Sequence, residues 1–382
     1  MFFEKAFIKG VIMGKVKEFL KRKDIEISLK RYGIDALGAM AQGLFCSLLI
    51  GTIIDTIGKQ FEIGFLTSTV ATVAGNDYTV GGLASAMSGP AMAVAIGYAL
   101  KCPPLVLFSM ITVGFSANAL GGAGGPLAVL FVAIIAAELG KIVSKETKID
   151  ILVTPLVTIG SGIFFSWLIA PPIGKGAMAV GQLIMDATEL QPFLMGIVVS
   201  VLVGIALTLP ISSAAICASF GLVGLAGGAA VAGCSAQMIG FAVISFRENR
   251  WGGLISQGIG TSMLQMPNII KNPRIWIAPT LASAITGPLA TCVFNLRMNG
   301  APVSSGMGTC GLVGQIGVYT GWVNPSQKAI ELGETALSEI TVFNWVGLIL
   351  ISFVLPAILS LCFDAIFRKI GWVKDGDMKL AD

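Results

Sequence analysis

The chain has 382 residues, of which 55% are apolar and only 12% are charged, and its formal net charge is +4. Soluble domains carry about 25% charged residues, so this composition, with a mean hydropathy of +0.85, excludes a cytosolic globular enzyme, a disordered chain and a nucleic-acid binder. Histidine is absent, which excludes Ser–His triads and imidazole metal sites. We therefore expect an all-α, polytopic helical membrane protein with no catalytic residues, no metal and no other cofactor.

The first 32 residues are basic and amphipathic. Lysine and arginine alternate with large apolar residues, and the apolar positions 8, 12, 16 and 19 recur at helical spacing. This pattern predicts a basic amphipathic helix over residues 1–32 that lies on the membrane surface. The segment is too charged for a signal peptide. Its charge alone also allows a nucleic-acid-binding arm, but the apolar face fits lipid better.

Residues 33–367 alternate between long apolar runs and short polar breaks. A helix needs about 20 apolar residues to cross a bilayer, and at that length this region predicts roughly ten membrane segments. A Gly-rich break at 121–126 lacks the strand-and-helix context of a nucleotide loop and predicts a kink or hairpin. The runs without Asp, Glu, Lys or Arg are 78–100, 102–137, 151–174, 190–246, 275–296, 298–327 and 340–363.

The distribution of basic residues predicts the orientation. Lysine and arginine collect at the N-terminus, in the 141–148 loop and in the 368–382 tail, so all three are expected in the cytoplasm. Both termini on one side require an even number of crossings. The seven cysteines form no C-x-x-C pair and are expected to be small buried apolar residues.

Two of the apolar runs are broken in the same way, at 210–224 and at 302–314. Each break reads Pro, a β-branched residue, Ser-Ser, a small-residue stretch with one Cys, and Gly-Leu-Val-Gly. Irregular backbone at membrane depth survives only where protein or a water-filled cavity surrounds it. We therefore predict two re-entrant hairpins, each a half-helix begun by proline whose first turn offers donors to an anionic or hydroxyl-rich ligand. The alternative is that the small residues merely let helices pack closely.

The predicted substrate site lies between these two hairpins. Polar residues inside membrane segments are costly and indicate function, and the pair at 76–77 suits either a cavity wall or a short loop. The candidate binding residues are Ser212, Ser213, Ser304 and Ser305 near the half-helix ends, with Asn299, Gln315, Asn76 and Asp77 as wall groups.

The stretch 151–224 resembles the membrane permease (EIIC) component of bacterial sugar phosphotransferase systems, especially the fructose type. The resemblance is carried by Thr154-Pro155-Leu156 opening an apolar helix, by Pro171-Pro172, and by the Gly-rich element at 121–126. It extends over 33–367 and points to the branch of PfoR-type toxin regulators. Fructose permeases have an acidic residue, Gly-Gly-Pro and Asn-Lys where this chain has 207–213, so the polar groups left in that element are Thr208, Ser212 and Ser213.

The resemblance implies a permease of the bacterial inner membrane that moves a small polar, sugar-like solute by alternating access. It also implies a homodimer. Only about fifteen residues follow the last membrane segment, so any phosphotransfer is expected to need a separate cytoplasmic phosphocarrier protein. The alternative from a different class is a non-transporting EIIC-like membrane sensor or regulator that binds a small molecule or lipid.

Overall fold

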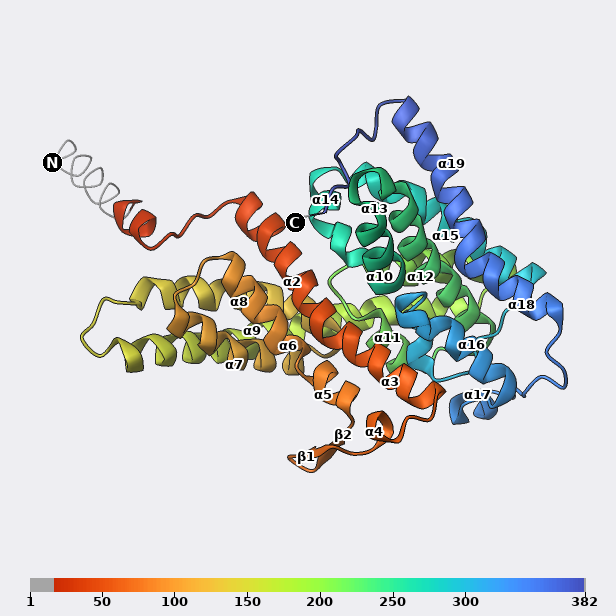
Figure 1. The fold of residues 1–382 in the computed structure, drawn as a ribbon, viewed down its shortest axis with the longest axis horizontal. Coiled ribbons are helices and arrows are strands. Elements are labelled where there is room, and N and C mark those ends of the chain that lie inside the picture. The colour runs from red at the N-terminus through yellow and green to blue at the C-terminus, as the bar shows by residue number, and fades with distance from the viewer. Residues whose placement is uncertain (1–16, 381–382) are drawn as a thin grey trace.

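The computed structural model describes residues 17–380. The predicted surface helix therefore lies largely outside the described residues; of its range, 17–22 are helical and the chain then runs to a long helix that begins at Lys30. Almost all regular structure in the described part is helical, and one two-stranded sheet is present. Figure 1 shows a helical group around α6–α9 on one side and a second group, α10–α19, on the other.

The first membrane helix runs from Lys30 to Gln60. It contains α2 (Ala36–Leu44) and α3 (Ile50–Gln60), joined and preceded by π-helical turns. After α4 (Gly64–Thr67) comes the hairpin of β1 (Ala71–Val73) and β2 (Asn76–Tyr78). The pair α5 (Val80–Ala86) and α6 (Ser88–Ala99) is bent by 49°.

The apolar stretch 104–143 forms two antiparallel helices rather than one span. The helices are α7 (Pro104–Gly121) and α8 (Gly125–Val143), and Val106 near the start of the first packs on Gly140 near the end of the second. The turn requires glycine because Gly122 has φ +51°. Of the kink or hairpin predicted at 121–126, the structure shows the hairpin.

Helix α9 (Asp150–Thr188) packs along both α7 and α8. Its 39 residues extend about 58 Å at 1.5 Å per residue, well beyond the bilayer core of about 30 Å. A helix of this length that crosses a membrane either extends beyond the hydrocarbon layer or is strongly tilted.

The second group surrounds α12 (Gly224–Ile244), the most buried of the membrane-length helices described. Glycines let backbones touch α12 directly: a Cβ on Gly228 would overlap the carbonyl oxygen of Leu296, and a Cβ on Gly233 would overlap that of Ser200. The remaining helices are α10 (Pro192–Thr208), α11 (Ser213–Phe220), α13 (Phe246–Ile255), α14 (Met266–Lys271), α15 (Ile277–Pro288), α16 (Val313–Val323), α17 (Gln327–Glu331), α18 (Val342–Ile349) and α19 (Leu355–Lys369), with short 3-10 turns η5 (Ser262–Gln265), η6 (Pro273–Trp276), η8 (Pro302–Gly306) and η9 (Cys310–Leu312) and the π-helical turn η4 (Ser256–Gly260).

Within the described residues, six helices are long and apolar enough to cross a membrane, or seven if the bent α5–α6 pair counts as one span. Dividing 104–143 into its two helices and adding the shorter α10 gives eight, or nine with the bent pair. The predicted number of about ten included the two re-entrant hairpins. The segments α11 and η8 are too short to cross. The chain is an all-α polytopic membrane protein.

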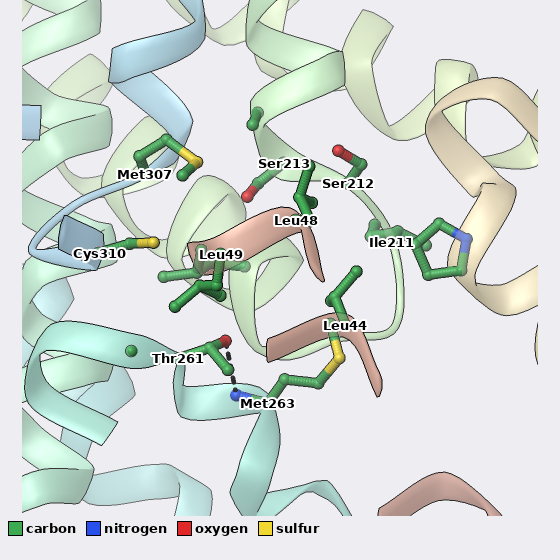
Figure 2. Close-up of a pocket in the computed structure, with 14 residues that line it drawn as sticks. Leu44, Leu48, Leu49, Ile211, Ser212, Ser213, Thr261, Met263, Met307 and Cys310 are labelled. Atoms are coloured by element: carbon green, nitrogen blue, oxygen red, sulfur yellow. Dashed lines mark hydrogen bonds between the residues drawn. The ribbon is translucent and has the colours of Figure 1, made fainter. Parts of the chain in front are cut away.

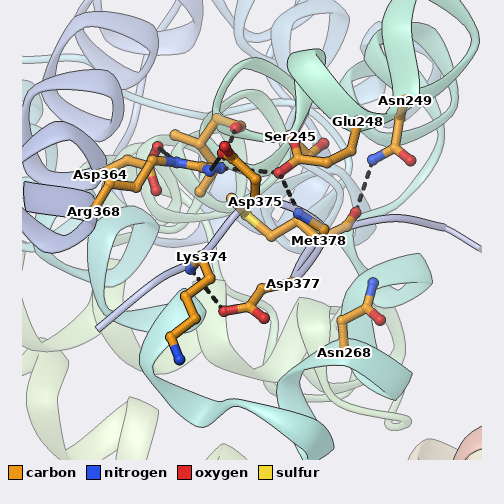
Figure 3. Close-up of polar contacts among 12 residues, drawn as sticks. Ser245, Glu248, Asn249, Asn268, Asp364, Arg368, Lys374, Asp375, Asp377 and Met378 are labelled. Atoms are coloured by element: carbon orange, nitrogen blue, oxygen red, sulfur yellow. Dashed lines mark hydrogen bonds and ion pairs between the residues drawn. The ribbon is translucent and has the colours of Figure 1, made fainter. Parts of the chain in front are cut away.

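The C-terminal segment folds back onto α13 and α14 as far as residue 380 (Figure 3). Arg368 pairs with Asp364 at 2.7 Å, with Glu248 at 3.2 Å and with Asp375 at 2.7 Å. The buried Met378 accepts hydrogen bonds at its carbonyl oxygen, from Asn249 Nδ2 at 2.8 Å and from Gln265 Nε2 at 3.0 Å. The predicted tail is therefore part of the packed structure.

Candidate functional site

The two broken segments contact each other through their serines. Ser213 Oγ donates to the carbonyl oxygen of Gly306 at 2.7 Å, and Ser305 Oγ donates to that of Leu222 at 2.6 Å. Both hydroxyl-bearing residues are buried. A Cβ on Gly306 would lie 2.5 Å from the Ser213 carbonyl oxygen, so glycine is needed for this approach. The predicted pairing of 210–224 with 302–314 is present in the structure.

The helix starts differ from the prediction at the first break. Here α11 begins at Ser213, and Ser212 caps it by accepting from Ala215 N at 3.1 Å. Proline 210 lies in the preceding turn instead of the first turn of the helix. At the second break Pro302 does open the 3-10 turn η8. The difference arises because the Ser212 hydroxyl satisfies a free N–H of the helix, which proline cannot do.

A small pocket lies where α11 meets the Lys30–Gln60 helix (Figure 2). Its volume is about 50 Å³. Ser212 and Ser213 supply its polar atoms on one side and Thr261 on another, while the rest of the lining is mostly apolar. The other labelled lining residues are Leu44, Leu48, Leu49, Ile211, Met263, Met307 and Cys310.

A polar cluster forms beside the second break. Arg297 Nη1 and Glu334 Oε1 are 2.5 Å apart, and Asn299 Nδ2 donates to Glu334 Oε2 at 3.1 Å. Asn299 is buried, and its Oδ1 has no hydrogen-bond partner among the described residues. Residues 299 and 304 lie against successive turns of α16, at Gly321 and Gly317. The backbone of Asn299 and the side chain of Ser304 therefore lie against one face of α16.

Gln315 stands at the start of α16 and faces α12. Its Nε2 donates to Ser235 Oγ at 3.2 Å, and its buried Oε1, like Asn299 Oδ1, has no partner in residues 17–380. Two of the predicted wall groups thus present an unused acceptor oxygen next to the second broken segment.

The other two predicted wall groups lie elsewhere. Asn76 and Asp77 belong to the exposed β1–β2 hairpin, and Thr72 Oγ1 donates to Asp77 Oδ1 at 2.6 Å. This hairpin packs on α5 and lies at the edge of the molecule, whereas α11 lies in its middle (Figure 1). The sequence allowed either a cavity wall or a short loop for this pair, and the structure shows the short loop.

A buried polar network next to the pocket was not predicted as part of the site. Thr208 and Ser262 hydroxyls are 2.8 Å apart, Trp276 Nε1 donates to Gln237 Oε1 at 2.9 Å, and Gln237 Nε2 donates to Thr280 Oγ1 at 3.2 Å. The sequence indicated this network only by Gln237, the one glutamine in the run of small residues that forms α12. Glu334 gave no such signal, because it follows a polar loop.

The family model of the phosphotransferase system, EIIC, matches residues 34–380. No curated protein and no solved structure matches the chain. The matched region includes both broken segments, the Gly-rich hairpin and all of the membrane-length helices except the first four residues of the first one. The chain belongs to the EIIC family of the phosphotransferase system, whose members are membrane permeases, and this agrees with the resemblance seen in its sequence.

Proposed function

We propose that this EIIC protein translocates a small polar, sugar-like solute by alternating access and binds it between α11, η8 and α16. The observation that carries the proposal is the pair of buried, unpartnered amide oxygens, Asn299 Oδ1 and Gln315 Oε1. An unpaired buried polar group costs about 1–3 kcal/mol, and native proteins keep few of them. Both free atoms are acceptors, and a sugar supplies hydroxyl donors.

The polar face along α16 supports the same ligand chemistry. The Glu334 carboxylate adds further acceptors next to Asn299, and the Ser304 side chain lies one turn away at Gly317. Hydroxyls and amides recognise a neutral polyol without a strong charge of one sign. Arg297 is already paired with Glu334, so this cluster favours a neutral solute over an anionic one.

The size of the pocket supports a moving site. About 50 Å³ holds a few water molecules at most, whereas ligand pockets typically measure about 300–1,000 Å³. This pocket reaches the second broken segment only at Met307 and Cys310 and does not include Asn299 or Gln315. We therefore infer that the two segments separate to admit a sugar. Separation breaks the bonds of Ser213 to Gly306 and of Ser305 to Leu222, and it frees both hydroxyls for the solute.

The remaining parts of the proposal follow the family. The protein lies in the bacterial cell membrane as a homodimer with both termini in the cytoplasm, and a separate phosphocarrier phosphorylates the solute. We also propose that the protein belongs to the PfoR-type branch of the family.

Uptake of a panel of labelled sugars into proteoliposomes, with and without a phosphocarrier, tests the function. The site is tested by binding to the purified protein. Asn299→Ala and Gln315→Ala are each expected to weaken binding about tenfold, because each removes one buried hydrogen bond to the ligand. Ser109→Ala is the matched control, because its hydroxyl bonds only to Leu105 O in its own helix.

Each negative result has a separate meaning. Normal binding by both folded variants would show that the site is elsewhere. Absence of both uptake and binding across the panel would favour the non-transporting sensor.

A further inference from the structure

A second cavity opens on the outside of the helical bundle, between α10 and α15. Its volume is about 250 Å³. The two helices run antiparallel and touch near one end, where a Cβ on Gly287 would overlap the carbonyl oxygen of Gly196. The cavity lies at the other end of this helix pair. Its lining residues are Ile205, Pro273, Trp276, Ile277, Thr280 and Leu281.

The polar atoms of this groove are turned inward. Trp276 Nε1 donates to Gln237 Oε1, and Thr280 Oγ1 donates to the Trp276 carbonyl oxygen at 2.8 Å while accepting from Gln237 Nε2. The surface offered to an occupant is therefore apolar. The segment Pro273–Val293 is long and apolar enough to cross a membrane, and α10 is a shorter apolar helix. Lipid is therefore the expected medium at this surface, and an acyl chain fills such a groove without loss of hydrogen bonds.

The turn η6, which supplies Pro273 and Trp276 to the groove, also carries an exposed arginine. Arg274 follows the lining residue Pro273 and is exposed, and its guanidinium lies 5.5 Å from the ring centroid of Trp372. No carboxylate in residues 17–380 forms an ion pair with Arg274. Exposed tryptophan and arginine at a helix end are typical of the membrane–water interface, so this end of the groove is expected at headgroup depth.

We propose that this groove binds one anionic phospholipid of the cytoplasmic leaflet, with an acyl chain between α10 and α15 and its phosphate on Arg274. Arginine holds a phosphate through two parallel N–H donors. The leaflet follows from the C-terminal segment, which is predicted to be cytoplasmic and contacts this end: Asn272 Nδ2 donates to Trp372 O at 3.0 Å. The bound chain would also cover Gln237, whose network reaches Thr208 beside the pocket.

Native mass spectrometry of the detergent-purified full chain tests the site, with phosphatidylglycerol and phosphatidylcholine of identical acyl chains as probes. We expect tighter binding of phosphatidylglycerol. Arg274→Gln should weaken that binding about tenfold, the value of one charge-assisted hydrogen bond, and leave phosphatidylcholine unchanged. Arg247→Gln is the matched control, because Arg247 is also exposed but lies on α13, which contributes no residue to the groove.

The acyl-chain part of the proposal has its own variant. Ile205→Trp fills the groove and should weaken both lipids. Equal binding of the two lipids, or equal effects of Arg274→Gln and Arg247→Gln, would show that lipid binds the protein surface without specificity. Either result would overturn the proposed phosphate site. Unchanged affinity in the folded filling variant would overturn the groove as the acyl-chain site.

Discussion

Several buried hydroxyls of the two helical groups have different kinds of partner. In the α7–α9 group, Ser109 and Thr158 donate to carbonyl oxygens one turn earlier in their own helices, at 2.7 and 2.8 Å. In the α10–α16 group, Ser200 donates to Ser283 O on another helix at 2.8 Å, and Ser213 and Ser305 donate across the two broken segments. The same residue types pack regular helices in one group and hold irregular backbone together in the other.

This difference concerns what each hydroxyl requires of the neighbouring segments. A hydroxyl that is satisfied within its own helix makes no demand on its neighbours. A hydroxyl that satisfies a carbonyl on another segment must be released if the two segments part. The second group therefore contains the bonds that the proposed transport cycle would exchange, and changes there should have larger effects than matched changes in the first group.

The largest effect is expected at the ion cluster that holds the C-terminal segment to the second group. Arg368→Gln leaves Asp364 and Glu248 buried without a positive partner, and breaking a buried pair in this way costs about 3–5 kcal/mol. Chemical denaturation in mixed micelles measures the loss. Lys369→Gln is the control, because Lys369 is exposed next to Arg368. Equal stability of the two variants would show that the C-terminal segment is dispensable for the fold.

Gly228→Ala should have the next largest effect. The added Cβ would overlap the Leu296 carbonyl oxygen, and overpacking of this kind costs about 1–3 kcal/mol. Gly160→Ala in α9 meets open space and should instead stabilise the helix by about 0.5–1 kcal/mol. Thermal unfolding in detergent gives both values, and a stable Gly228→Ala protein would contradict the close contact between α12 and the 294–298 segment.

The serine comparison is tested directly by three single substitutions. Ser213→Ala and Ser305→Ala each leave a buried carbonyl oxygen without its donor and should lower the free energy of unfolding by about 1 kcal/mol or more. Ser109→Ala should be nearly silent, because the Leu105 carbonyl keeps its helical bond. Denaturation curves for the three variants measure the difference. Equal losses would show that the hydroxyls of both groups act alike.

The smallest effect concerns pH and the anchor of the N-terminal segment. Arg31 pairs with Asp24 at 2.6 Å, and its hydrogen bond lowers the pKa of this carboxyl below its usual value of 3.8. A lowered folded-state pKa means that the stabilisation is present above pH 3.8 and is lost as the pH falls through the folded value. Half of the Asp24 side chain is exposed, so the effect should stay below about 1 kcal/mol.

Asp24→Asn removes this pair at every pH. The stability difference between Asp24→Asn and the unaltered protein should be constant from pH 7 to 5. It should begin to decline near pH 3.8, the ordinary pKa of the group, and vanish only below the lowered folded-state pKa. Thermal unfolding over this pH range measures it. A difference that persists at low pH would mean that the carboxylate charge is not what anchors the segment.

The sequence by itself determined the class of this protein and the places where its helices break. Hydropathy and low charge required membrane helices, and the repeated proline, Ser-Ser and glycine pattern located the two segments that the structure brings together. The Gly-rich hairpin at 121–126 was equally visible, because a turn of positive φ needs glycine whatever surrounds it. These features depend on the backbone preferences and the hydrophobicity of the residues themselves, and both can be read from the sequence.

Tertiary structure alone decided which polar groups share a site. Asn76 and Asp77 looked like Asn299 in the sequence, yet they lie on an exposed hairpin, whereas Glu334 came to Asn299 from a polar loop 35 residues away. Whether a serine bonds within its own helix or across to another segment likewise depends on the neighbour that the fold supplies. The physical reason is that a hydrogen bond depends on distance and direction in space, and residues far apart in the chain acquire these only when the helices pack.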